Sequence, residues 1–176
     1  MKYFTLLIIL LFTMGSIEIV DFNKNSNIEK WVIIDDVVMG GRSSGSFRID
    51  PDGNGAFEGS VSLENNGGFS SVRYQLGKLQ IDGNTRVILR IKGDGKRYQF
   101  RIKANSSDSF SYIYSFATTG EWEQVEIPLG EMYPSFRGRR LSQPNFSNNY
   151  IEELAFLIGN KKEETFKLLI DKIELK

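Results

Sequence analysis

Short runs of alternating apolar and polar residues fill most of this sequence, and they constrain its fold more than any other feature. In residues 86–92 and 97–103, apolar residues stand at every second position, and most residues between them are Arg, Lys or Gln. This alternation is typical of a β-strand with one buried and one exposed face. Helical periodicity is almost absent. The sequence therefore predicts an all-β chain.

Similar runs recur along the chain, separated by clusters of Gly, Asn and Asp, which favour turns. The pattern predicts eight to ten strands, within residues 17–22, 57–64, 72–76, 86–92, 97–103, 110–116, 125–129, 153–160 and 165–176. So many short strands favour two packed antiparallel sheets, that is an antiparallel β-sandwich or jelly roll. The Asp94-Gly95 pair predicts a hairpin. Residues 133–149 have two prolines and no periodicity, and they predict a long loop.

The first residues have the layout of a secretory signal peptide: a positive start, an apolar run from Phe4 to Met14, and then small residues. This layout predicts a signal peptide over residues 1–15 and a single β-sandwich domain over residues 16–176. We expect an exported product, periplasmic or secreted, with a cytoplasmic location as the alternative. The apolar run is short for a bilayer span, and no cysteine is present for a lipid anchor. We therefore expect no stable membrane insertion after leader removal.

Missing residue types exclude several kinds of chemistry. The chain contains no Cys and no His, which excludes disulfides, thiolate nucleophiles, His general bases and nearly every zinc site. Lys plus Arg and Asp plus Glu both number 22, so the charge balance does not favour nucleic acid. We therefore predict no nucleic-acid partner and no cofactor. Catalysis would have to use carboxylates, Lys, Tyr or Ser.

The Gly-rich segment IDDVVMGGRSSG, residues 34–45, contains candidate binding residues. Glycines permit close backbone approach, and exposed N–H groups beside hydroxyls hold an anion or a sugar hydroxyl. The alternative is a loop that only links two strands through Asx and Ser turns. The candidates from this segment are Asp35, Asp36, Met39, Gly40, Gly41 and Ser43.

The segment IDPDGNGAFEG, residues 49–59, begins like an EF-hand calcium loop, with Asp50, Asp52 and Asn54 in the first ligand positions. The twelfth position is Val61, where the loop requires a bidentate Glu, and no helices flank the segment. We therefore predict a hairpin turn. A structural calcium held by other loop carboxylates stays open.

The segment SLENNGGFSSVR, residues 62–73, has more turn residues than a hairpin needs, and its Asn66-Gly67 pair predicts a type I′ turn. After the turn, Phe69, Ser71 and Arg73 lie opposite the apolar face of the strand. On a curved sheet they are expected to form a shallow groove with other side chains. The alternative is a solvated face with Arg73 in a surface ion pair. The groove candidates are Asn65, Asn66, Phe69, Ser71, Arg73, Gln99, Arg101, Trp122 and an aromatic residue of the strand at 110–116.

The chain resembles the complex I intermediate-associated protein 30 family in six pieces of sequence, in the family's order: DDVVMGGRSSG, FEGSVSLENNGGFSSVR, IKGDGKRYQFRI, FATTGEWEQVEIPL, FRGR and FKLLIDKIEL. They extend from Trp31 to the end. The resemblance implies a galactose-binding-like jelly roll, an architecture also used by carbohydrate-binding modules. It also implies protein partners, because the mitochondrial members are assembly factors that bind intermediates of respiratory complex I. The secretory leader differs from a mitochondrial one.

Three functions follow from these observations. The leading hypothesis is a non-enzymatic binding module that assists the assembly or stabilisation of a protein complex. The alternative is an exported carbohydrate-binding module that takes a glycan. The least favoured is a glycosidase built from Asp35 or Asp36 with Glu64, whose carboxyl groups would have to lie about 5 to 10 Å apart.

Overall fold

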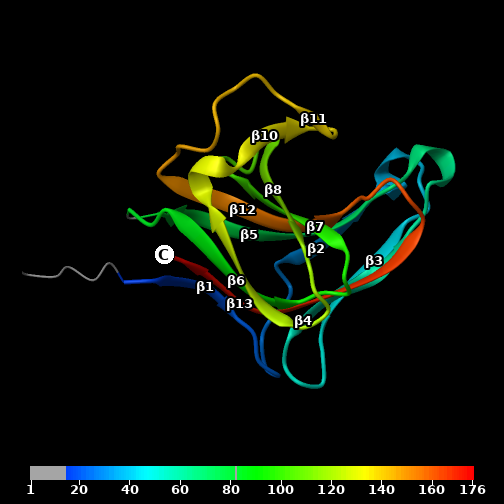
Figure 1. The fold of residues 1–176 in the computed structure, drawn as a ribbon, viewed down its shortest axis with the longest axis horizontal. Helices are drawn as coiled ribbons and strands as arrows, with labels where there is room; N and C mark the ends of the chain where they lie inside the picture. The colour runs from blue at the N-terminus through cyan, green and yellow to red at the C-terminus, as the bar shows by residue number, and fades with distance from the viewer. Residues whose placement is uncertain (1–14, 82) are drawn as a thin grey trace, which may run out of the picture.

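The computed structural model describes residues 15–81 and 83–176, which form a sandwich of two antiparallel sheets (Figure 1). The six-stranded sheet has the order β3 (Ser44–Ile49), β4 (Gly55–Val61), β13 (Glu164–Leu175), β6 (Arg86–Lys92) and β9 (Trp122–Pro128), and β1 (Ile17–Asp21) also pairs with β13. The seven-stranded sheet has the order β11 (Arg139–Arg140), β10 (Tyr133–Phe136), β8 (Ser111–Ala117), β7 (Arg97–Lys103), β12 (Tyr150–Ile158), β5 (Ser70–Gln80) and β2 (Trp31–Asp35). The predicted antiparallel β-sandwich is confirmed.

Three short 3₁₀ turns interrupt the strands: η1 (Asp36–Met39), η2 (Glu64–Asn66) and η3 (Leu129–Glu131). No helix among the described residues is long and apolar enough to cross a membrane. The signal peptide predicted over residues 1–15 lies outside the described residues, apart from Gly15.

The apolar faces of the strands meet between the sheets, as the alternation predicts. Val87, Leu89 and Ile91 of β6 are fully buried, and Phe100 of β7 packs edge-on against Phe156 of β12 with ring centroids 5.4 Å apart. Strand β12 is buried on both faces, because Ala155 and Leu157 on its outer side are covered as well. The outer surface of the seven-stranded sheet is therefore partly covered over β12, which lies between β7 and β5.

Aromatic rings join the two sheets at the β2 edge. Trp31 of β2 stacks on Tyr74 of β5 at 4.7 Å and on Phe47 of β3 at 4.6 Å, so one side chain contacts both layers. Phe22 closes the cluster, with its ring 5.5 Å from that of Trp31. This packing fixes the edge strand that leads directly into η1.

The hairpin predicted at Asp94-Gly95 is wrong, because β6 and β7 lie in different sheets and residues 93–96 cross between them. Gly95 does have the positive φ of a tight turn, 81°. The Asp94 carboxylate, however, accepts hydrogen bonds from the Tyr98 hydroxyl (2.9 Å) and the Lys167 backbone N–H (3.0 Å), which ties the crossover to both sheets. The basic faces of β6 and β7 consequently point outward on opposite sides of the sandwich.

Two other turn predictions have different outcomes. The hairpin at residues 50–54 is confirmed, because β3 pairs with β4 from Ile49 opposite Gly55, and the Asp50 carboxylate accepts the backbone N–H groups of Asp52 and Asn54. The loop predicted over residues 133–149 is wrong at its start, where β10 and β11 form a hairpin. Arg137 and Gly138 both have positive φ (49° and 75°), as a two-residue turn of the I′ kind requires.

Candidate functional site

A groove of about 510 Å³ lies on the outer face of the seven-stranded sheet. Strands β5, β7 and β12 provide its floor. The β10–β11 hairpin forms one side, and the end of η1 together with residues 67–69 forms the other. In Figure 1, η1 and η2 lie together at one end of the sandwich, beside these strands.

Two arginines dominate the floor of the groove. In the strand register, Arg73 of β5 and Arg101 of β7 are both partners of Ala155 on the intervening strand β12. Residues paired across neighbouring strands point to the same face, so both guanidinium groups project outward above the small Ala155 side chain. Ala155 is only 3% exposed. The Ala155 side chain between the two arginines is therefore shielded from solvent.

Arg101 has a neutral partner in place of a carboxylate. Its Nε and Nη2 atoms donate to Oε1 of Gln99, at 3.0 and 2.6 Å. Burial, and then the nearby Arg73 guanidinium, lower the pKa of Arg101 to about 10. Within residues 15–81 and 83–176, neither Arg73 nor Arg101 forms an ion pair. Two cationic groups thus share a partly buried site without a counter-charge.

The rest of the groove adds positive charge and hydroxyl groups. Lys103 and Arg137 bring the cationic side chains of the described lining to four, whereas Asp108 is the single carboxylate there. Lys103 already donates to the backbone carbonyls of Ser106 and Asp108 and pairs with the Glu153 carboxylate at 3.9 Å, so the uncompensated charge belongs to the three arginines. The whole chain has no net charge, so this excess is a local property of the groove.

The groove has apolar side chains on both rims. Met39 of η1 is 54% exposed, and Phe136 of β10 is 41% exposed. Val37 and Val38, which precede Met39, are also exposed. An exposed group of large apolar side chains beside a charged floor is typical of an interaction site.

A buried carboxylate holds the η1 rim in place. Asp36 is fully buried, and its Oδ2 accepts the backbone N–H groups of Gly68 (2.6 Å) and Phe69 (3.2 Å) and the hydroxyl of Ser43. Its Oδ1 accepts the N–H of Ser43 at 2.9 Å. One side chain therefore joins the segment at 36–43 to the segment at 67–69. We call this arrangement the Asp36 clamp.

The electrostatics of the Asp36 clamp favour the ionised carboxylate. Burial alone would raise the pKa of Asp36, but the hydrogen bonds from Ser43, Gly68 and Phe69 outweigh it and hold the pKa below its ordinary value. The clamp also requires two glycines. A Cβ on Gly41 would lie 2.3 Å from Oδ1 of Asp36, and a Cβ on Gly67 would lie 2.6 Å from Oδ2.

The sequence that forms these loops and strands matches the model of a known protein family. The family model named Complex I intermediate-associated protein 30 (CIA30) matches residues 20–170. The chain belongs to the CIA30 family. The mouse mitochondrial complex I intermediate-associated protein 30 is 26% identical over 173 residues, which cover 85% of this chain and 53% of the mouse protein. The chain thus spans about half the length of this curated relative.

The CIA30 chain also resembles carbohydrate-binding modules in its fold. A family 11 module from Clostridium thermocellum, solved with a β-1,3-1,4-mixed-linked tetrasaccharide, has a TM-score of 0.68 at 17% identity, covering 92% of this chain and 95% of that chain. A family 29 module has a TM-score of 0.54 at 6% identity, covering 92% and 91%. At these identities, the likeness establishes a shared β-sandwich of the jelly-roll kind.

The structure brings five of the predicted binding residues of this CIA30 chain together in the groove: Met39, Phe69, Arg73, Gln99 and Arg101. Asp36, Gly41 and Ser43 lie beneath the rim in the Asp36 clamp. Gly40 closes η1 with a φ of 91°.

Two other predicted binding residues, Asp35 and Ser71, make hydrogen bonds within the fold, and a third, Trp122, lies outside the groove. The carboxylate of Asp35 accepts the Gly45 N–H at 2.8 Å, and the Ser71 hydroxyl donates to the Ile34 carbonyl at 2.8 Å. Trp122 is wrongly assigned to the groove, because it lies on β9 in the other sheet, opposite Lys92. Its ring instead faces the Arg90 guanidinium, 5.8 Å from the ring centroid.

The type I′ turn predicted at Asn66-Gly67 is displaced by one residue. Asn65 and Asn66 are the residues with positive φ (55° and 61°), and the Gly67 N–H donates to the Glu64 carbonyl at 3.0 Å. The segment also does not close a hairpin, because it leads from β4 in one sheet to β5 in the other. Position 67 needs a glycine because a Cβ there would collide with the Asp36 carboxylate.

The β10–β11 side of the groove was missed. The lack of periodicity over residues 133–149 predicts a loop and does not identify Ser135, Phe136 or Arg137 as groove residues. The available signal was the Arg137-Gly138 pair between Phe136 and Arg139, a dipeptide suited to a tight hairpin.

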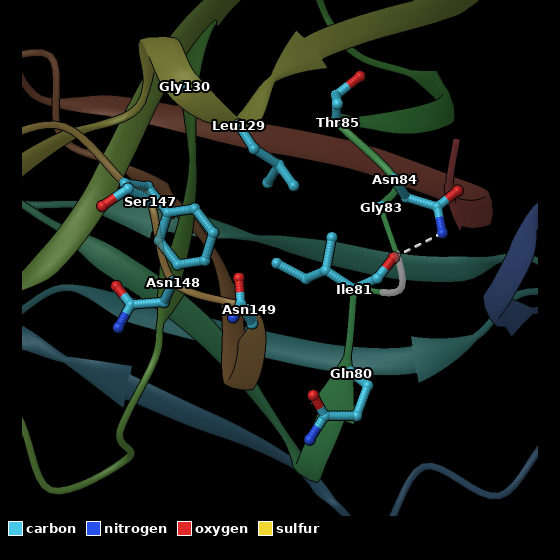
Figure 2. A pocket seen from close by; sticks show the side chains of 11 residues that line it. Gln80, Ile81, Gly83, Asn84, Thr85, Leu129, Gly130, Ser147, Asn148 and Asn149 are labelled. Carbon is cyan, nitrogen blue, oxygen red and sulfur yellow. Dashed lines mark hydrogen bonds between the residues drawn. The ribbon is translucent and has the colours of Figure 1, made fainter.

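A second cavity, of about 500 Å³, lies between the end of β5, η3 and residues 146–149 (Figure 2). Ile81 and Leu129 point toward each other in it, and Asn84 donates to the Ile81 carbonyl at 2.6 Å. The described lining residues are uncharged. The cavity therefore lacks the uncompensated charge of the groove, and we base the candidate site on the groove.

Two of the carboxylates predicted for a glycosidase, those of Asp36 and Glu64, already have structural partners. Asp36 has no exposed surface, and the hydrogen bonds of its carboxylate are those of the Asp36 clamp. Glu64 forms an exposed ion pair with Arg42 at 2.9 Å. Among the described residues, no group of three or more acidic side chains is arranged to hold a metal ion.

The crowding of the two arginines leads to a prediction about stability. Arg73→Gln is expected to raise the free energy of unfolding by about 0.5 to 1 kcal/mol, because it removes a like charge near the partly buried Arg101. Residues retained for binding often reduce stability in this way. Urea denaturation at pH 7 measures the effect. Arg86→Gln, which breaks the exposed pair with Glu126 on the other sheet, is the control and should not stabilise. A destabilised R73Q variant would contradict the prediction.

Proposed function

We propose that this chain is a non-catalytic binding module that assists the assembly or stabilisation of a protein complex, with the groove as its contact site. The observation that carries the proposal is the pair Arg73 and Arg101, partly buried without a carboxylate partner between exposed apolar rims. Arg, Met and aromatic side chains are enriched in protein–protein interfaces. Family membership supports the same role, since the mouse relative is named for its association with complex I intermediates.

Site-specific photo-crosslinking in the native cells tests this proposal. A photoreactive benzoylphenylalanine replaces Phe136 at the groove or, as the matched control, Trp122 on the opposite sheet. Both are aromatic, and they are 41% and 39% exposed. We expect a discrete crosslinked protein from position 136 alone, identified by mass spectrometry and then bound again as a purified partner. Crosslinks of equal yield from both positions, or none from position 136, would contradict the proposal.

A carbohydrate ligand for the same groove is the second candidate function. Phe69 and Phe136 present aromatic surface beside the hydroxyls of Ser109, Ser111 and Ser135, a combination that suits a sugar ring. Isothermal titration with a mixed-linked β-1,3-1,4 tetrasaccharide tests it. Millimolar or tighter binding that Phe136→Ala removes would favour this candidate over the first.

An exported location belongs to the proposal as well, supported by the signal-peptide layout of residues 1–15. Mass spectrometry of the native N-terminus is the measurement. We expect a chain that begins near residue 16, and an intact Met1 on cytoplasmic protein would contradict export.

A further inference from the structure

Arg73 and Arg101 on the floor of the groove form no ion pair with a described residue, because the buried carboxylate of Glu153 on the same face is paired with Lys103 at 3.9 Å. Arg73 and Arg101 project from strands on either side of β12, and burial already disfavours the charged form of Arg101. A buried charge without a counter-ion is costly, and the cost falls when an anion binds. Gln99 supplies only a neutral oxygen to Arg101. The site is therefore electrostatically incomplete until a ligand brings negative charge.

The donors that remain suit a planar anion. Nε and Nη2 of Arg101 both point at the Gln99 oxygen, which fixes the plane of the guanidinium. Arg73 donates no side-chain hydrogen bond to any described residue, so its whole fork is available. Guanidinium groups bind carboxylates in a bidentate manner, and a group that is already oriented loses less entropy on binding.

We infer that Arg73 and Arg101 receive the carboxylates of an acidic, extended segment of the protein partner, whose apolar residues pack against Met39 and Phe136. This inference rests on the proposed function and names the chemistry of the partner. Arg73, Arg101 and Arg137, which form no ion pair with a described residue, provide the charge complementarity, whereas Lys103 is paired with Glu153. The aliphatic rim at Val37, Val38 and Met39 favours a protein segment over an acidic polysaccharide, which has no aliphatic side chains to bury there.

Fluorescence anisotropy tests the inference with a labelled twelve-residue peptide of repeating Leu-Glu-Glu units. A Leu-Gln-Gln peptide of equal length is the neutral comparison, and unlabelled polygalacturonate is the acidic polysaccharide competitor. We expect the acidic peptide to bind at least tenfold more tightly than the neutral one. Its affinity should fall as sodium chloride rises from about 50 to 500 mM, because exposed charges are then screened.

Two variants with the same change in net charge locate the binding. Arg73→Gln is expected to weaken the acidic peptide at least tenfold while the protein stays folded, and Arg86→Gln on the opposite sheet is expected to leave the affinity unchanged. Equal loss in both variants, or equal binding of the neutral peptide, overturns the inference. Polygalacturonate that binds through Arg73 while the peptide does not bind overturns it in favour of an acidic polysaccharide.

Different experimental results would overturn the acidic-segment inference and the proposed function. A partner that crosslinks at position 136 and binds wild type and R73Q equally overturns the acidic-segment inference and leaves the proposed function standing. Absence of any crosslink at position 136 overturns the proposed function itself, whatever the peptide does.

Discussion

Replacing Asp36 with alanine is expected to lower the free energy of unfolding by about 3 to 5 kcal/mol, because four hydrogen bonds to a buried carboxylate disappear together. The Gly68 and Phe69 N–H groups and both donors of Ser43 would then lack their acceptor. Asp36→Asn keeps one acceptor oxygen and should lose less stability than D36A. Urea denaturation at pH 7 measures both variants.

The control for this prediction is Asp52→Ala, which removes an exposed carboxylate from the turn at 50–54 and should change the free energy of unfolding by less than about 0.5 kcal/mol. A D36A protein as stable as D52A would show that the Asp36 clamp does not stabilise the fold. A destabilised but folded D36A protein should also bind its partner less well, because Met39 and Phe69 lose their anchor.

Acid titration provides a second readout for Asp36. The folded pKa of Asp36 lies below the unfolded value of about 3.9. Its contribution to the free energy of unfolding is therefore complete above that pH and disappears as the pH falls through the folded pKa. Wild-type stability should therefore fall below about pH 4. The D36A variant should show a shallower fall in the same range, and parallel curves would contradict the assignment.

Trp31→Ala is the second substitution with a large expected effect, a loss of about 3 to 5 kcal/mol in the free energy of unfolding. Trp31 is buried between Tyr74 of one sheet and Phe47 of the other, and its removal leaves a cavity where the two layers meet. Because β2 leads into η1, the variant should also loosen the groove rim. Denaturant unfolding, followed by the fluorescence of the remaining Trp122, measures the loss.

Trp122→Ala is the matched control for W31A. Trp122 is 39% exposed on β9 and contacts Arg90 outside the core, so its loss should cost less than about 1 kcal/mol. If W31A and W122A were equally stable, the aromatic cluster would not hold the sheets together.

The fold class follows from local patterns, whereas the assignment of strands to sheets does not. The alternation of Val87, Leu89 and Ile91 identifies a strand with one buried face, and the structure places these residues in the core. At Asp94-Gly95, however, a hairpin and a crossover both need a tight turn with positive φ. Only long-range contacts decide between them, here the bond from the Lys167 N–H to Asp94.

The same limit explains the outcomes at the site. Arg73 and Arg101 were predicted from the polar face of their strands, and the register places both beside Ala155. Trp122 was assigned wrongly because alternation shows which face a residue occupies and leaves the sheet undetermined. Asp36 looked like a surface ligand in a Gly-rich loop, and its burial depends on Gly68 and Phe69, more than thirty residues away.

The position of β13 has a consequence for biosynthesis. This strand, Glu164–Leu175, pairs with β1, β4 and β6, so three strands that are made earlier all depend on it for their pairing. Before β13 has been made, the strand that lies between β4 and β6 in the six-stranded sheet is missing. We therefore expect the six-stranded sheet, and with it the packed sandwich, to form only once residues 164–175 have emerged.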